Sequence, residues 1–198
     1  MGIDVIHVLG ASGSGVTTLG QNIEQNYGYK WLDTDDYFWL PTEPLFSTPR
    51  PIDERISLME TDITKNSKCV ISGSLCGWGD VFISKFQLVI FIYTPAEIRK
   101  ERLIKREYQR YGEKRLHKGG DRHEEHIKFI NWAMDYDNGD MNMRSLRNHE
   151  EWLKQFFCPV IRLDGTDTIA HNLSQLEKYL VQGPLSEKCF DPPSYHKP

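Results

Sequence analysis

A glycine-rich loop after the first apolar run constrains the fold of this chain more than any other feature. Residues 10–17 read GASGSGVT, and they directly follow the apolar residues 5–9. This spacing matches the phosphate-binding pattern G-x-x-x-x-G-K-[ST], in which a buried strand leads into the loop and a helix follows it. Glycines let backbone N–H groups converge on an anion, and the helix N-terminus adds partial positive charge. The loop therefore predicts a site for nucleotide phosphates.

One position departs from the pattern, because Val16 stands where lysine is expected. Thr17 keeps the hydroxyl that ligates Mg²⁺ in such loops. The alternative interpretation is a tight strand–helix connection with no ligand. The predicted phosphate-binding residues are Gly10, Ser12, Gly13, Ser14, Gly15, Val16, Thr17 and Thr18.

Length and composition favour one domain. The chain has 198 residues and a net charge of −4, which argues against general binding of nucleic acid or anionic membranes. The longest apolar run, residues 88–93, is far shorter than a membrane span. The N-terminus enters the first strand without a signal-like segment, and the four cysteines lack metal-ligand spacing, so we expect a cytoplasmic protein with reduced thiols. Its oligomeric state stays open. We expect a domain over 1–182 and an extended tail over 183–198.

Apolar runs and helical periodicity alternate along the chain. Strands are predicted at 3–9, 30–32, 69–71, 88–93 and 160–163, and helices at 17–26, 52–66, 96–110, 124–133, 145–156 and 169–180. This alternation predicts an α/β fold with a parallel sheet between helical layers. Thr94, Pro95 and Glu97 predict a capping box at the start of the 96–110 helix.

Acidic residues follow the second predicted strand. Ligands of parallel sheets bind at the carboxyl ends of the strands, which draws attention to Asp33 and Asp35. If the chain stays extended, both carboxylates face the same crevice. One can hold Mg²⁺ and the other can accept a proton from a substrate hydroxyl. The alternative is an acidic loop in which Asp35 or Asp36 caps the next segment.

Four further residues are candidates for contact with a second substrate. Ser72 and Gly73 follow the third strand, where small residues admit a substrate close to the backbone. Trp78 either forms a wall for an organic ring or closes the core. Arg50, between two prolines, can hold an acidic group, although Arg55 competes for that role.

The 96–110 helix is rich in cations, and Arg102 and Arg106 share one face because they lie four residues apart. A solvated basic helix is the alternative interpretation. A Gly-Gly pair follows at 119–120, so we expect a lid over about 106–140 whose arginines close over phosphates and supply the charge that Val16 lacks. After the fifth strand, Gly165 and Thr166 form a turn that contacts a nucleobase or serves only as a helix cap.

Taken together, these residues resemble the nucleoside-monophosphate-kinase and shikimate-kinase branch of P-loop proteins. The resemblance rests on the loop 10–17, the pair Asp33 and Asp35, the Ser-Gly-Ser turn at 72–74, the pair Arg102 and Arg106, and the turn at 164–166. The loop without its lysine, together with residues 33–37 and 72–79, also resembles uncharacterised bacterial adenylate-kinase-like ATPases. The resemblance implies a five-stranded sheet of order 2-3-1-4-5 and ATP·Mg²⁺ as donor. It also implies that Asp33 and Thr17 serve Mg²⁺ and that Asp35 serves the acceptor.

The leading hypothesis is an ATP-dependent kinase for a nucleotide or a small hydroxylated metabolite. Asp35, Arg102 and Arg106 are its predicted catalytic residues. The base-selective motif of GTPases is absent, which favours ATP. The alternative is a regulatory nucleotide-binding protein or weak ATPase, since Val16 replaces the lysine. A third interpretation is a binder of another phosphorylated metabolite.

Overall fold

The computed structural model describes residues 2–182 of the chain, and the tail predicted at 183–198 lies outside the described residues. Its parallel sheet has the order β2-β3-β1-β4-β5, which confirms the expected order. The strands are β1 (Val5–Gly10), β2 (Lys30–Asp33), β3 (Cys69–Ser72), β4 (Leu88–Tyr93) and β5 (Val160–Asp164).

Eight α-helices and two 3₁₀ helices surround or extend this sheet within the described residues. The α-helices are α1 (Val16–Tyr27), α2 (Thr34–Phe38), α3 (Ile52–Lys65), α4 (Ala96–Tyr111), α5 (Glu113–Leu116), α6 (His123–Met134), α7 (Leu146–Leu153) and α8 (Ile169–Gln182). The 3₁₀ helices are η1 (Asp80–Lys85) and η2 (Asp135–Asp137). All six predicted helices are present, with ends that differ by at most three residues.

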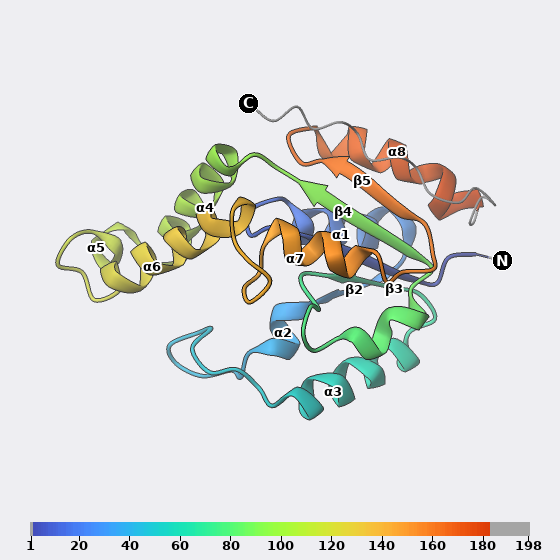
Figure 1. Cartoon of the computed structure of the whole chain (residues 1–198), viewed down its shortest axis with the longest axis horizontal. Helices are drawn as coiled ribbons and strands as arrows, with labels where there is room; N and C mark the ends of the chain where they lie inside the picture. The colour runs from blue at the N-terminus through green and yellow to red at the C-terminus, as the bar shows by residue number, and fades with distance from the viewer. Residues whose placement is uncertain (1, 183–198) are drawn as a thin grey trace.

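Both faces of the sheet are buried, which explains why its strands read as continuous apolar runs. Successive side chains of a strand point to opposite faces. In β4, Leu88 and Ile90 join the core formed with α1 and α8, whereas Val89 and Phe91 join the core formed with α3, η1 and α7. The result is a three-layer α/β/α arrangement (Figure 1).

The helices α4 to α6 leave the sheet on one side (Figure 1). The second half of α4 packs on α6, and Leu103 and Ile130 form a small separate core there. We call α4, α5 and α6 together the helical arm. It includes most of the segment, about 106–140, in which the sequence predicts a lid. Its position beside the carboxyl ends of the strands places its cations near the glycine-rich loop.

Two local predictions are wrong. The chain does not stay extended after Asp33, because α2 starts at Thr34 and the Asp33 carboxylate caps it by accepting a hydrogen bond from the Asp35 N–H (3.0 Å). The capping box is also absent. The Thr94 hydroxyl donates to the Ser14 carbonyl (3.1 Å) instead, so it braces the glycine-rich loop and leaves Pro95 as the N-cap of α4.

Candidate functional site

The glycine-rich loop connects β1 to α1 and lines a cavity of about 730 Å³, here called the phosphate cavity. Gly13 and Gly15 have φ angles of 82° and 105°, which other residues rarely adopt. A Cβ at Gly13 would lie 2.9 Å from the Arg99 carbonyl oxygen. The backbone therefore needs glycine here, and the loop holds the N-terminus of the 12-residue α1 open toward the cavity.

All eight predicted phosphate-binding residues line this cavity, and Val16 is the first residue of α1. Its side chain is buried and packs with Leu19 and Ile23 in the core. No lysine is among the described residues that line the cavity. Four arginines supply the positive charge there: Arg102, Arg106, Arg110 and Arg144.

Arg102 is tied to the backbone of the site. One guanidinium nitrogen donates to the Gly165 carbonyl (2.9 Å) and another lies 3.4 Å from the Gly13 carbonyl. Arg102 thus links α4 to the glycine-rich loop and to the turn after β5. Its charge also lies at the cavity wall, so it combines a bracing contact with a favourable field for an anion.

Arg106 differs from Arg102 because, among the described residues, it takes part in no hydrogen bond or ion pair; its guanidinium lies 5.8 Å from the centroid of the Phe129 ring. Burial and the neighbouring Arg110 lower the pKa of its guanidinium, and Glu107 and Asp35 act in the opposite direction. Glu107 lies 4.0 Å from Arg110, so of these two adjacent arginines it is Arg106 whose charge is left to favour an anionic ligand. Arg106 is therefore the described cation that best fits the charge missing at Val16.

Thr17 and Asp33 meet at the edge of the cavity. Burial and the nearby Asp35 and Asp36 raise the pKa of the Asp33 carboxyl to about 6, while the neighbouring Thr17 hydroxyl and the Asp35 N–H act in the opposite direction. A bound cation would stabilise the charged form of this partly buried carboxylate. A hydroxyl and a carboxylate are ligand types that Mg²⁺ uses. The pair fits a magnesium ion bound beside nucleotide phosphates.

The predicted second-substrate residues separate into two groups. Gly73 lines the phosphate cavity, but Ser72, Trp78 and Arg50 line neither cavity described here. Ser72 accepts a hydrogen bond from the Trp31 indole (2.7 Å), and Trp78 is part of the apolar core.

Arg50 is held by backbone carbonyls and does not reach the cavities. Its guanidinium donates to the carbonyls of Tyr37 (3.0 Å) and Trp39 (3.3 Å). Arg55, the alternative, lies over the Phe38 ring at 3.8 Å and donates to the Arg50 carbonyl. Both arginines stabilise the entry into α3, because the irregular segment before it leaves backbone acceptors without partners of their own.

The turn after β5 reaches the phosphate cavity only in part. Gly165 lines the cavity, as do Asp167 and Asn172 of the following segment, whereas Thr166 does not. The Thr166 N–H donates to the Asp164 carboxylate (2.7 Å), so this residue closes the turn.

A second cavity of about 690 Å³ adjoins the first, and we call it the aromatic chamber. Its walls include Phe38, Trp39, Phe46, Tyr111, Phe129 and Trp132. Seven residues line both cavities: Ser12, Thr34, Asp35, Phe46, Arg106, Arg110 and Arg144. Asp35 therefore stands at the junction where a second substrate in the chamber would meet a phosphate in the first cavity.

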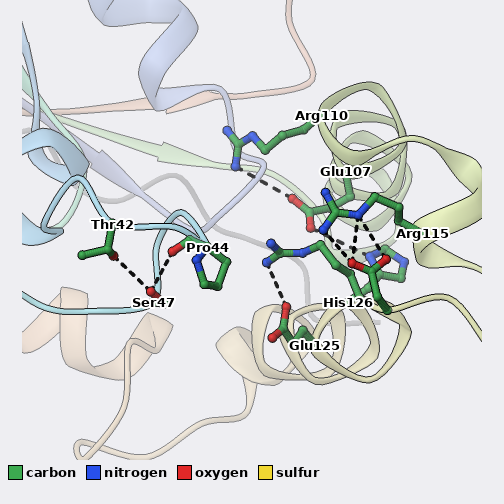
Figure 2. A network of polar contacts seen from close by, with 10 residues as sticks. Thr42, Pro44, Ser47, Glu107, Arg110, Arg115, Glu125 and His126 are labelled. Atoms are coloured by element: carbon green, nitrogen blue, oxygen red, sulfur yellow. Dashed lines mark hydrogen bonds and ion pairs between the residues drawn. The ribbon is translucent and has the colours of Figure 1, made fainter.

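Figure 2 shows the two sides of the chamber. On one side, the loop before α3 is braced by the Ser47 hydroxyl, which donates to the Pro44 carbonyl (2.7 Å). On the other side, Glu107 lies 4.0 Å from Arg110 and 3.9 Å from His126 across α4 and α6. The chamber thus lies between a loop and the helical arm.

A buried polar chain ends at the floor of the chamber. Ser74 lines the chamber, and its hydroxyl lies 3.2 Å from His149 Nε2. The other ring nitrogen of His149 lies 2.9 Å from the Tyr136 hydroxyl. Burial lowers the pKa of His149 to about 3, with smaller contributions from Arg144 and His7. A neutral His149 therefore fixes the orientation of Ser74.

Sequence reasoning missed Phe46 and Arg144 as lining residues of both cavities. Phe46 lies in an irregular loop, and Arg144 precedes the N-cap of α7. Neither position carries a local pattern. In the described residues there is also no cluster of three or more candidate metal ligands, and no helix long and apolar enough to cross a membrane.

No protein-family model matches the sequence. The chain is 42% identical over 175 residues to the uncharacterized protein YqaC of Bacillus subtilis (strain 168), which covers 88% of this chain and 96% of that protein. It is 31% identical over 113 residues to the cytidylate kinase of Pyrococcus abyssi (strain GE5 / Orsay), which covers 52% of this chain and 61% of the kinase.

Among solved structures, shikimate kinase from Bacteroides thetaiotaomicron matches with a TM-score of 0.55 and 16% identity, over 90% of this chain and 98% of that one. At this identity the match concerns the fold alone. The match to YqaC extends over nearly the whole of both chains, and the sheet order is that of the P-loop kinases. The protein therefore belongs to the same family as YqaC and has the P-loop kinase fold.

Proposed function

We propose that the protein is a phosphotransferase that moves the γ-phosphoryl group of ATP to a small acceptor. One observation carries the proposal: the phosphate cavity and the aromatic chamber share Asp35 and Arg106 at their junction. A donor phosphate and an acceptor bound on the two sides would meet at these residues. The partial match to cytidylate kinase supports the same reaction class.

The donor side would be held mainly by the backbone. Residues 13–17 line the phosphate cavity at the start of α1, where the N–H groups of a helix N-terminus favour anions; the Ser14 N–H is the exception, because it donates to the Ala11 carbonyl (3.1 Å). Thr17 and Asp33 would hold Mg²⁺, which supplies positive charge to the outer phosphates when bound. The turn at Gly165 would lie along the nucleoside. An ATP-dependent reaction also fits the cytoplasmic location expected from the sequence.

The transfer step itself needs positioning and charge rather than a covalent intermediate. An acceptor oxygen forms a bond to the γ-phosphorus while the bond to the bridging oxygen of ADP breaks. If the acceptor is a hydroxyl, Asp35 takes its proton. Arg106 stabilises the charge that develops on the transferred group, in place of the lysine that Val16 replaces.

Val16 also favours a second candidate, a regulatory protein or weak ATPase that binds nucleotide without useful transfer. The two candidates predict different products. Incubation with ATP and Mg²⁺ and a panel of nucleoside monophosphates and hydroxylated metabolites, followed by phosphorus NMR, tests them. The proposal expects ADP together with a new phosphate ester or anhydride. Tight ATP binding with no product, or with free phosphate only, supports the alternative.

A further inference from the structure

The aromatic chamber presents rings from two sides. Phe38, Trp39 and Phe46 belong to α2 and the loop that follows it, while Tyr111, Phe129 and Trp132 belong to α4 and α6. Large aromatic side chains are usually buried, yet Phe46 and Trp132 are 37% and 38% exposed. Exposed rings that line a hollow are suited to stacking with a planar ligand.

Phe46 is placed in the chamber by an unusual backbone conformation. Its φ angle is +60°, and it is the one non-glycine residue with positive φ in the described chain. Non-glycine residues with positive φ are uncommon, and strained backbone positions cluster at binding and active sites. The surrounding loop holds it, since the Leu40 N–H donates to the Thr48 carbonyl (2.9 Å) and Trp39 bridges to Pro49. The loop therefore presents the Phe46 ring to both cavities.

The charge of the chamber favours an anion. Its charged lining residues are five cations (Arg106, Arg110, Arg122, Lys128 and Arg144) and three carboxylates (Asp35, Glu107 and Glu125). Glu125 pairs with Arg122 (2.9 Å), and Arg110 lies 4.0 Å from Glu107 (Figure 2). The Arg110 guanidinium also lies over the Phe46 ring, 4.8 Å from its centroid. No such ion pair is found for Arg106 or Arg144 among the residues the structure describes.

Arg144 places a positive charge beside the aromatic wall of the chamber, because its guanidinium lies over the Trp132 ring, 5.6 Å from the ring centroid. A ligand that stacks on this side would have its acidic group within reach of an arginine. The six aromatic residues of the lining favour a ring over a polyhydroxylated aliphatic compound.

We propose that the acceptor is an anion that carries a planar aromatic ring, with Phe46 and Trp132 contacting the ring and Arg144 and Arg106 contacting the anionic group. This inference rests on the proposed phosphotransferase function, since it assigns the substrate class of the same site. A nucleoside monophosphate and an aromatic carboxylate share this chemistry, and the experiment separates them.

The test is a set of calorimetric titrations of the full chain in the presence of Mg²⁺ and a non-hydrolysable ATP analogue. The probes are CMP and AMP, 4-hydroxybenzoate, and the ring-free ribose 5-phosphate. We expect at least one ring-bearing anion to bind tenfold or more tightly than ribose 5-phosphate. Equal or tighter binding of ribose 5-phosphate overturns the inference.

Three variants assign the effect to the chamber. Phe46→Gly removes the ring while keeping a residue suited to positive φ, and Trp132→Leu tests the second wall without any backbone change. Each is expected to weaken ring binding tenfold or more. Trp132 lies outside the phosphate cavity, so Trp132→Leu is also expected to leave the affinity for the ATP analogue unchanged. Phe157→Ala is the matched control, because Phe157 is 99% exposed and lines neither cavity.

The readout separates this inference from the proposed function. Unchanged ring affinity in both Phe46→Gly and Trp132→Leu overturns the inference even if phosphoryl transfer occurs. Transfer from ATP to a ring-free compound as the preferred acceptor overturns it as well. Tight, Phe46-dependent binding of a ring anion without any transfer supports the chamber's specificity and contradicts the phosphotransferase proposal alone.

Discussion

Arg102 donates a hydrogen bond to the carbonyl of Gly165 (2.9 Å), which fastens the stem of the helical arm to the turn after β5. Arg106 lies one helical turn further along α4 and lines both cavities. The two arginines share a face of α4, as their spacing predicts, but they have different surroundings. Arg102 braces the site, and Arg106 leaves its charge available to a ligand.

Substitution of Arg102 tests the bracing contact. Arg102→Ala removes its hydrogen bonds to Gly165 and Gly13, and hydrogen bonds of charged groups contribute roughly 1.5–3 kcal/mol. We expect ATP affinity to fall about tenfold or more, because the glycine-rich loop and the turn at Gly165 each lose a hydrogen bond that holds them in place. Lys105→Ala is the control, because it removes the same charge from α4 outside both cavities. Equal affinities of the two variants for ATP would show that Arg102 does not support the site.

Gly15 tests the phosphate cradle. Gly15→Asp introduces a carboxylate where we expect phosphate oxygens, so nucleotide binding is predicted to be lost. Positive φ also strains this variant, at 105°. Gly28→Asp is the matched control, since Gly28 has a φ of 71°, caps the other end of α1 and lies outside the cavity. If Gly15→Asp binds ATP as well as Gly28→Asp does, the loop is not a phosphate site.

Asp35 is predicted to act on the acceptor rather than on the nucleotide. Asp35→Asn removes a proton acceptor at the junction of the cavities, so turnover of a hydroxyl acceptor is expected to fall by 10²-fold or more. ATP affinity is expected to change little. Steady-state kinetics alongside ATP titration provides the measurement, with Asp53→Asn on α3 as the control. Wild-type turnover in the Asp35→Asn variant contradicts this role.

Buried histidines predict acid sensitivity. Burial lowers the pKa of both His7 and His149 to about 3, from an ordinary 6.5. Between pH 6.5 and 3 these histidines bind protons in the unfolded chain but stay neutral in the folded chain. The free energy of unfolding therefore decreases by about 1.4 kcal/mol per histidine for each unit by which the pH is lowered. Asp33 has the opposite effect between pH 6 and 3.8. Its folded pKa of about 6 lies above the ordinary 3.8, so its contribution to stability increases as the pH is lowered through this range.

Urea unfolding at pH 7.5 and at pH 5 measures this acid sensitivity. His7→Leu keeps the apolar contacts with Phe86 and removes one titrating group. We expect the variant to lose less stability than the wild type between the two pH values. The same pH dependence in both proteins would mean that His7 is not held neutral in the folded state.

The sequence predicts the sheet well because its strands are buried on both faces. The apolar runs at 88–93 and 160–163 need no tertiary context to be recognised as strands. The glycine-rich loop is equally local, since its pattern depends on backbone conformation at Gly13 and Gly15. The strand order followed from the family resemblance, and the structure confirms it.

The parts that sequence reasoning missed depend on distant partners. Thr94 fits a capping box locally, yet its hydroxyl bonds to Ser14, 80 residues away in the chain. Trp78 reads equally well as a ligand wall or as core, and packing alone places it in the core. Phe46 and Arg144 reach the cavities only because α2, α4 and α6 converge there. Local patterns carry no information on that convergence.

The central claim is that Arg106 supplies the charge that Val16 does not. The direct measurement is the rate of γ-phosphoryl transfer from ATP in the wild type, Arg106→Ala and the double variant Val16→Lys/Arg106→Ala, with folding checked by thermal denaturation. The account predicts that Arg106→Ala loses roughly 10³-fold in rate with little loss of ATP affinity, and that the added lysine restores part of the rate. An Arg106→Ala protein that transfers phosphate at the wild-type rate, or a wild type that binds ATP and transfers none, contradicts it.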